Sequence, residues 1–308
     1  MKPDCSIIVL ATNEITTLRR TLPLLFRQSG VNLREMVLID SGSTDGTLPW
    51  LDRYSEEEPR FRVHKQTPAD FHHARTRNLG LDLVSGEIIV LLAGDASPER
   101  EDWLASLIAP ILEDDKVAGC YGRQRPRPDA DTPNRLRSLW NYKKTPILKD
   151  LHNPPMTAKE RCYFSTVNCA LHRERLGDLR FDEEIPVNED VSLSWRLLNA
   201  GWKLAYAPQA SVIHSHNLSP SQLMRRYFDN AVTYRQIGIH QPGEKSIAGD
   251  AYGFGRFVLR SLRGRPVWEW AEMGLFLGAG ALGILAGRLE PKLPRPIARW
   301  FSQYGTAG

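Results

Sequence analysis

The chain has 308 residues, enough for one large domain or two smaller ones with a sizeable core. Its composition, 42% hydrophobic and 25% charged, is that of an ordinary globular protein and not of a biased or fibrous chain. The net charge of +4 is weak but unevenly placed, because residues 222–308 hold 12 Lys and Arg against 6 Asp and Glu. A basic tail on a near-neutral body favours an anionic surface, either membrane headgroups or nucleic acid.

The first half of the chain alternates short apolar runs with helical patterns. Runs rich in β-branched residues predict strands at 6–11, 35–40, 87–92 and 117–121, with a weaker strand around Val63. Helical patterns cover residues 15–27, 47–54, 71–83 and 102–112. This order predicts an α/β fold, a mostly parallel sheet flanked by helices.

The cysteines and the N-terminus give two further expectations. Cys5, Cys120, Cys162 and Cys169 lack CxxC spacing, so we expect free thiols in a reducing compartment. A strand begins within the first few residues, so we expect no targeting segment.

The stretch DSGSTDGT, residues 40–47, directly follows the second predicted strand. Ligands of open parallel sheets bind outside the carboxyl ends of the strands, where Asp40 lies. Two interpretations stay open: a ligand-binding loop, or a plain turn in which Thr44 or Asp45 caps the next helix. The glycine pattern G-x-G-x-x-G is absent after both early strands, which argues against a nicotinamide enzyme.

The helix around HHARTRNLG, residues 72–80, carries two arginines. Arg75 and Arg77 lie about 200° apart around a helix, so they cannot both face one ligand. One guanidinium directed at phosphates and a structural arginine anchoring a carboxylate both fit this pattern.

The stretch IIVLLAGDASPE, residues 88–99, brings one carboxylate, Asp95, to the end of a buried strand between small residues. A hard divalent cation prefers oxygen ligands at such a place, where a phosphate can complete its coordination. Asp95 alone is a poor ligand set, so a metal ion needs another protein ligand and the substrate.

The second half of the chain is less regular. Residues 123–160 are rich in Pro, Arg and Asn and predict a long surface excursion with a short helix around 136–142. A strand is predicted in 162–171, a helix over 189–199 closed by Gly201, and two short strands at 203–208 and 210–216. A helix then opens at Ser219 or Ser221 and runs to 236. The uncharged segment 273–287 contains five glycines and fits either a packed helix or a membrane-interfacial one.

Two polar pairs fall in this half. Glu189 and Asp190 occupy the first turn of a predicted helix, where the helix dipole alone favours acids. His214 and His216 alternate along a predicted strand and so share a face, which suits either a structural pair or metal ligands.

Four segments in one order resemble family-two glycosyltransferases of the GT-A fold: SIIVLATNE, VLIDSGSTDGT, ARTRNLGLDLVSGEIIVLLAGDASPE and NEDVSLSWRLLNAGWKLAYAPQASVIHSH. The resemblance runs from about Ser6 to Tyr234. Four segments, FHHARTRNLG, YGRQRPRPDA, Phe164 to Ala170 and HSHN, are most similar to bacterial rhamnosyltransferases of O-antigen or exopolysaccharide synthesis, which use dTDP-rhamnose.

The resemblance implies a Rossmann-like catalytic domain at 1–221 and a helical, basic C-terminal region at 222–308. It implies an inverting, metal-dependent hexosyltransferase in which Asp190, paired with Glu189, is the catalytic base and Asp95, His214 and His216 hold Mg²⁺ or Mn²⁺. The donor nucleotide would be bound by Thr12, Asn13, Glu14, Asp40, Ser43, Asp45, Arg77 and Asn78. The common D-x-D pair is missing, because Ser97 stands at the second carboxylate position.

The expected partners are a nucleotide-diphospho-sugar donor and a saccharide or lipid-linked glycan acceptor, with no nucleic acid. Peripheral membrane contact through 256–300 and a place in the cytoplasm, at the inner membrane, are expected from the basic tail. One alternative is a non-catalytic subunit that keeps the fold and binds nucleotide sugars. A nucleotidyltransferase would need a Gly-rich, Lys-bearing triphosphate loop, which the sequence lacks.

Overall fold

A computed structural model describes residues 2–154, 156–239 and 247–306. A nine-stranded sheet in the order β3-β2-β1-β4-β8-β6-β9-β5, with β7 beside β9, forms the centre. Its strands are β1 Asp4–Ala11, β2 Asn32–Asp40, β3 Phe61–Lys65, β4 Ile88–Ala93, β5 Ser97–Pro98, β6 Val117–Arg125, β7 Ile147–Lys149, β8 Asn168–His172 and β9 Lys203–Ile213.

The strands β1, β2, β3, β4, β6 and β9 run in one direction, and β5, β7 and β8 run against it. The sheet is therefore mostly parallel, as the alternation of strands and helices predicts. Because parallel strands end at the same edge, the segments after β1, β2, β4 and β9 are brought to one side of the molecule.

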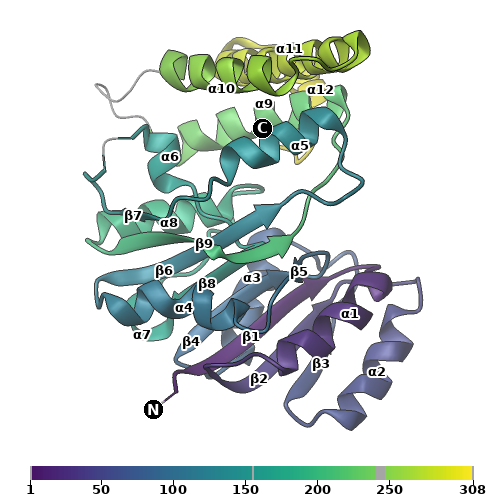
Figure 1. Cartoon of the computed structure of the whole chain (residues 1–308), viewed down its shortest axis with the longest axis vertical. Coiled ribbons are helices and arrows are strands. Elements are labelled where there is room, and N and C mark those ends of the chain that lie inside the picture. The colour runs from purple at the N-terminus through teal and green to yellow at the C-terminus, as the bar shows by residue number, and fades with distance from the viewer. Residues whose placement is uncertain (1, 155, 240–246, 307–308) are drawn as a thin grey trace.

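Helices cover both faces of the sheet (Figure 1). Leucines and isoleucines of α1 Ile15–Phe26 and α4 Trp103–Glu113, with Leu51 of α2 Thr47–Glu57, close one core. The other core is closed by α3 His73–Leu83, α7 Arg173–Leu176 and α8 Glu189–Asn199. Because β1 and β4 are buried on both faces of the sheet, their sequences are continuous apolar runs.

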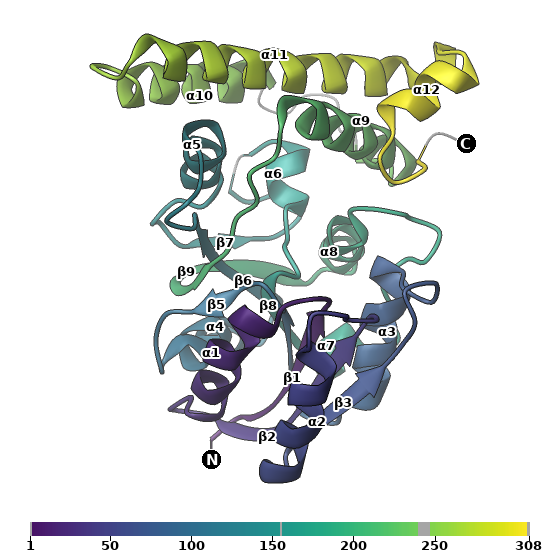
Figure 2. The same ribbon diagram turned by 90° about the vertical axis from the view of Figure 1, so that its right-hand side faces the viewer.

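The remaining helices lie beyond one end of the sheet. They are α5 Thr132–Asn141, α6 Ala158–Cys162, α9 Pro220–Gln236, α10 Ile247–Ser261, α11 Val267–Leu289, α12 Arg295–Phe301 and a short 3₁₀ turn, η1 Glu290–Lys292. In both views α10 and α11 form the outermost layer, and α5, α6 and α9 lie between that layer and the sheet (Figure 2).

Three expectations about elements need correction. Residues 203–213 form one strand with an irregular register near Gly122, and not two strands, so His214 and His216 follow β9 instead of lying in it. Residues 123–160 are no simple surface excursion, because β7 joins the sheet and its Lys149 is 1% exposed. Residues 162–167 precede the strand β8, and α6 ends at Cys162.

Other expectations are confirmed. Helix α8 spans 189–199, and Gly201 follows it with a positive φ of 86°. Ser219, not Ser221, caps α9, with a capping box completed by Gln222. All four cysteines are free and buried.

Candidate active site

Asp95 is placed by the close approach of two neighbouring strand ends. Gly94 follows β4 and donates its backbone N–H to the Leu10 carbonyl at 2.8 Å. A Cβ on Gly94 would lie 2.7 Å from the Cβ of Ala11, so the residue has no room for a side chain. The glycine therefore lets the Asp95 turn lie directly beside the segment after β1.

The histidines after β9 converge on this carboxylate. The Nε2 atoms of His214 and His216 lie 3.3 Å and 3.5 Å from one Asp95 oxygen. Among the residues that the structure describes, these three form the one cluster of His, Cys, Asp or Glu able to hold a metal ion, with ligand atoms within 4.8 Å of one another. His214 is buried, whereas His216 is 53% exposed and faces solvent.

Gln124 orients the buried histidine. Its Oε1 lies 2.9 Å from Nδ1 of His214, and its own amide donates to the Ser165 hydroxyl at 2.8 Å. Since the Gln124 amide nitrogen donates to Ser165, its oxygen accepts a hydrogen bond from Nδ1–H of His214, and Nε2 faces Asp95. Nε2 is therefore the atom that a metal ion would bind, and a hydrogen-bonded second nitrogen is usual for metal-binding histidines.

The local electrostatics agree with a cation site. Burial acts to raise the pKa of Asp95, but the His214 hydrogen bond and the two histidines lower it overall. Burial and the nearby Asp95 carboxylate raise the pKa of Glu14. Negative charge thus gathers at this edge of the sheet, where a divalent cation would relieve the repulsion.

Asp190 lies at the start of α8, in a different environment from Asp95. Its carboxylate accepts from the backbone N–H groups of Thr166 and Val191 at 3.3 Å and 2.9 Å. Burial raises the pKa of Asp190 to about 7; the charge of Glu189 adds to the rise and Arg77 opposes it. A carboxyl with a pKa near neutrality is poised to take a proton.

Arg77 and Glu189 form a buried ion pair next to this carboxyl. Their atoms lie 3.0 Å apart, and Arg77 also donates to the Thr166 hydroxyl and the His73 carbonyl. Arg75 points elsewhere, toward Glu183 at 3.5 Å, and is 63% exposed. Of the two arginines of α3, Arg77 is therefore the one that lies beside Glu189 and Asp190.

The loops after β1 and β2 are bonded to each other. Both oxygens of the fully buried Asp40 accept bonds from the turn, from the N–H groups of Gly42 and Ser43 and from the Ser43 hydroxyl. Ser43 in turn accepts the Asn13 N–H, and Asn13 accepts the Thr44 N–H. These contacts shape the loop that the sequence assigns to the nucleotide.

The other residues assigned to the nucleotide are placed as follows. Asp45 accepts from Thr47 and Ile15, which holds the starts of α2 and α1 together. The Thr12 hydroxyl donates to the Ala11 carbonyl. Asn78 lies apart from this loop: its amide bonds Phe181 and Glu183 and joins α3 to the segment before α8.

A polar cleft of about 560 Å³ opens beside His216. It is lined by Arg127, Asp129, Ser215, His216, Asn217, Leu218, Gln222, Arg226, Gln303 and Tyr304. Three residues of this region, Arg127, Arg226 and Gln124, are not predicted from the sequence. Gln124 could have been noticed as a polar residue near the end of a buried strand, β6. Nothing in the sequence points to Arg226.

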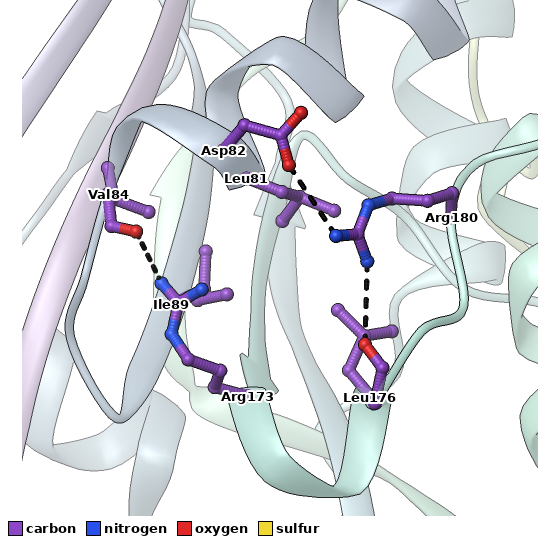
Figure 3. A pocket seen from close by; sticks show the side chains of 8 residues that line it. Leu81, Asp82, Val84, Ile89, Arg173, Leu176 and Arg180 are labelled. Carbon is purple, nitrogen blue, oxygen red and sulfur yellow. Dashed lines mark hydrogen bonds and ion pairs between the residues drawn. The ribbon is translucent and has the colours of Figure 1, made fainter.

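A second cavity, of about 270 Å³, lies near the start of β4, at the end opposite Asp95 (Figure 3). Its two arginines are already used: Arg173 donates to the carbonyls of Val84 and Gly86, and Arg180 contacts Asp82. The polar cleft, not this cavity, adjoins the metal cluster.

Comparison with known protein families identifies the family of this chain. A family model described as Glycosyl transferase family 2 matches residues 6–176. O-antigen chain rhamnosyltransferase WbaN of Salmonella anatum is 29% identical over 275 residues, 88% of this chain and 84% of the relative. O-antigen chain rhamnosyltransferase RfbN of Salmonella typhimurium is 27% identical over 281 residues, 90% and 88% of the two chains.

The solved structures support the same architecture. Mannosyltransferase PcManGT from Pyrobaculum calidifontis, in complex with GDP-Man and Mn²⁺, has a TM-score of 0.62 at 20% identity and covers 94% of this chain and 88% of its own. GalNAc-T7 with UDP, GalNAc and Mn²⁺ has a TM-score of 0.52 over 70% of this chain and 44% of its own. At these identities the likeness concerns the fold.

Proposed function

The chain belongs to glycosyl transferase family 2 and has the GT-A fold, and on that premise we propose that it is an inverting, metal-dependent rhamnosyltransferase. The donor is a nucleotide-diphospho-sugar, dTDP-L-rhamnose, because the relatives that span most of the chain are named rhamnosyltransferases. The acceptor is a saccharide or a lipid-linked glycan in polysaccharide biosynthesis. The observation that carries the proposal is the pairing of a cation cluster with a separate carboxyl of raised pKa.

The cluster of Asp95, His214 and His216 supports the metal-ion part of the proposal. One carboxylate and two imidazoles are ligands that Mn²⁺ accepts well, and the oxygens of a diphosphate add to them for either Mg²⁺ or Mn²⁺. A bound cation would neutralise the charge that develops on the diphosphate leaving group. The missing second carboxylate of a D-x-D pair is thus replaced by the two histidines after β9.

Asp190 supports the base role. In the proposed reaction the acceptor hydroxyl oxygen bonds to the anomeric carbon, the bond from that carbon to the diphosphate oxygen breaks, and Asp190 takes the hydroxyl proton. The Thr166 and Val191 N–H groups hold the carboxylate, and the Arg77–Glu189 pair sets its charge environment. Glu189 thus acts on Asp190 and not on the acceptor.

The nucleotide is proposed to bind at the loops after β1 and β2, whose side chains Thr12, Asn13, Glu14, Asp40, Ser43 and Asp45 shape that edge of the sheet. We propose that residues 1–221 form the catalytic domain and that residues 222–308 form the acceptor or membrane-surface region. The enzyme is proposed to work in the cytoplasm, at the inner membrane.

The test is a donor panel of dTDP-rhamnose, UDP-glucose, UDP-galactose and GDP-mannose, assayed for hydrolysis or transfer with Mg²⁺, Mn²⁺ or EDTA. We expect dTDP release that EDTA and Asp95→Ala abolish and that Asp190→Asn lowers by about 10²–10⁴-fold. Asp115→Asn, a change at an exposed aspartate, is the matched control and should keep full activity.

Other results would redirect the proposal. Turnover of another donor would refute the rhamnose assignment alone. Donor binding without turnover, after acceptors have been supplied, would favour the non-catalytic subunit. Full activity of Asp190→Asn would remove the base assignment.

A further inference from the structure

The long helix α11 has two unlike faces. Its inward face buries Met273, Phe276, Gly280, Gly283, Ala286 and Gly287. A Cβ on Gly283 would lie 2.2 Å from the Met224 carbonyl oxygen, and one on Gly287 would lie 2.6 Å from the Phe228 carbonyl oxygen. Two of the five glycines in 273–287 therefore let α11 lie against the backbone of α9.

The outward face of α11 is apolar and exposed. Its exposed large side chains are Val267 at 79%, Trp268 at 63%, Leu275 at 67%, Leu282 at 48%, Leu285 at 56% and Leu289 at 42%. No charged residue occurs from 273 to 287. Exposed large apolar side chains also occur on α10, at Tyr252 and Leu259, and on α12, at Ile297 and Trp300. Exposed apolar side chains gathered on one face of a helix mark an interaction site.

Basic residues flank this surface at both ends. Arg256, Arg260, Arg263 and Arg265 lie on α10 and the turn after it, and Arg288, Lys292, Arg295 and Arg299 follow the uncharged run. Two of the region's acids already have partners, since Glu269 contacts Arg265 and Glu290 contacts Arg235. An apolar face with a basic border matches a membrane whose headgroups are anionic.

We propose that the outer surface of α10, α11 and α12 docks on an anionic lipid bilayer, with α11 lying in the plane of the interface. This docking deepens the proposed function and rests on it, because a lipid-linked acceptor is part of that function. Helix α9 connects the two sites, because Met224 and Phe228 contact α11 while Gln222 and Arg226 line the cleft beside His216. A docked enzyme thus holds that cleft next to the membrane surface.

The structure favours lying on the membrane over crossing it. By length and composition, the helical stretch Val267–Lys292 could span a bilayer, and a third of its most apolar part is buried in the protein. That buried face contacts α9, which carries Arg225, Arg226 and Asp229. Insertion of α11 would have to strip it from α9 or draw these charges into hydrocarbon, and both are costly.

A second copy of the chain fits this surface less well. A two-fold interface brings the same surface against itself. Both ends of α11 are flanked by basic residues, so either pairing of the ends would oppose arginines to arginines. Anionic headgroups satisfy both ends at once.

The experiment is flotation of the full chain with vesicles of phosphatidylcholine alone and of phosphatidylcholine with phosphatidylglycerol. The test variant is Leu282→Ser/Leu285→Ser. The control is Leu112→Ser/Leu148→Ser, which changes two leucines of similar exposure, 51% and 48%, on α4 and β7. We expect wild type and control to float with the anionic vesicles, in a salt-sensitive way, and the test variant to bind at least tenfold less.

The proposal would be overturned by no flotation of wild type, by equal flotation of the test variant, or by a wild-type dimer in light scattering that is a monomer in the test variant. Resistance of the bound protein to carbonate extraction would indicate a spanning helix instead, and would also overturn it. Donor hydrolysis and thermal unfolding of both variants are measured in parallel. Because flotation needs no turnover, failure of docking and failure of the proposed reaction can be told apart.

Discussion

At the scale of single residues, the two key carboxylates differ in their surroundings more than in their chemistry. Asp95 lies among histidines that lower its pKa, whereas burial and Glu189 raise the pKa of Asp190 to about 7. In the proposed reaction, one carboxylate would stay ionised for a cation while the other would exchange a proton near neutral pH. Pairs of acids whose pKa values are driven apart commonly divide acid, base and electrostatic roles.

The raised pKa of Asp190 predicts a pH dependence. The base works only when ionised, so kcat/KM should rise with pH through about 7 and then level off. Arg77 lowers the pKa of this group, so Arg77→Gln should move the midpoint to higher pH. Arg75→Gln changes an exposed arginine on the same helix and should leave the midpoint in place. A flat profile, or one midpoint for all three proteins, would contradict the assignment.

Gln124 is predicted to act through His214 as a positioning residue. Gln124→Leu removes the acceptor for Nδ1, so the metal concentration at half-maximal activity should rise by about 10–100-fold. Activity at saturating Mn²⁺ should change much less. Gln209→Leu alters an exposed glutamine on β9 and is the control. A loss of activity that added metal does not restore would mean that Gln124 serves only the fold.

At the scale of elements, close packing of helices explains why α11 contains glycines, which by themselves weaken a helix. Glycine costs about 0.5–1 kcal/mol relative to alanine inside a helix. In α11 the cost is offset where Gly283 and Gly287 contact the α9 backbone. Gly274 and Gly278 have no such contact, because nothing lies within 4 Å of the position a Cβ would take on either.

This difference gives a matched pair of variants. Gly283→Ala should force α11 away from α9 and lower the free energy of unfolding by about 1–3 kcal/mol. Gly278→Ala should instead gain about 0.5–1 kcal/mol from helix propensity. Urea unfolding followed by circular dichroism measures both. The same sign of change for the two variants would show that the α9–α11 contact is not close.

Strand β9 shows why one expectation about elements was wrong. Pro208 and Gln209 interrupt the apolar alternation, which predicts two short strands. The structure keeps one strand, because β6 pairs with it on both sides of an irregular register: Gly122 opposite Ala207 and Arg123 opposite Ser211. The strand continues past this irregularity to Ile213, and His214 and His216 follow it and face Asp95.

At the scale of the whole molecule, the cluster of Asp95, His214 and His216 joins segments that are far apart in the sequence. A cation bound by Asp95 and the two histidines would tie the turn after β4 to the segment after β9. Binding to the folded state alone stabilises it, by about 2.7 kcal/mol at a metal concentration of 100 times Kd. Mn²⁺ should therefore raise the melting temperature of wild type.

His214→Ala should abolish that rise, because it removes the buried ligand. His152→Ala, which changes an exposed histidine outside the cluster, should keep it. Differential scanning calorimetry with and without Mn²⁺ measures the three proteins. An equal rise in the His214→Ala protein would place the bound cation elsewhere.

The local features of this protein can be predicted from its amino-acid sequence. Apolar runs identified β1, β2 and β4, and the acids of α8 and the polar turn after β2 stood out where the chain leaves a regular element. These signals are local, because periodicity reports which face of an element is buried and turn residues report where it ends. The family resemblance named the same segments, and family membership is confirmed.

The tertiary structure alone decided which side chains meet. The pairing of Arg77 with Glu189, the support of His214 by Gln124 and the packing of α11 on α9 all join residues separated by long stretches of chain. Such contacts depend on strand register and helix packing, which composition and spacing do not encode in any short segment. For the same reason the outward face of α11 could be separated from its inward face only after α9 was in place.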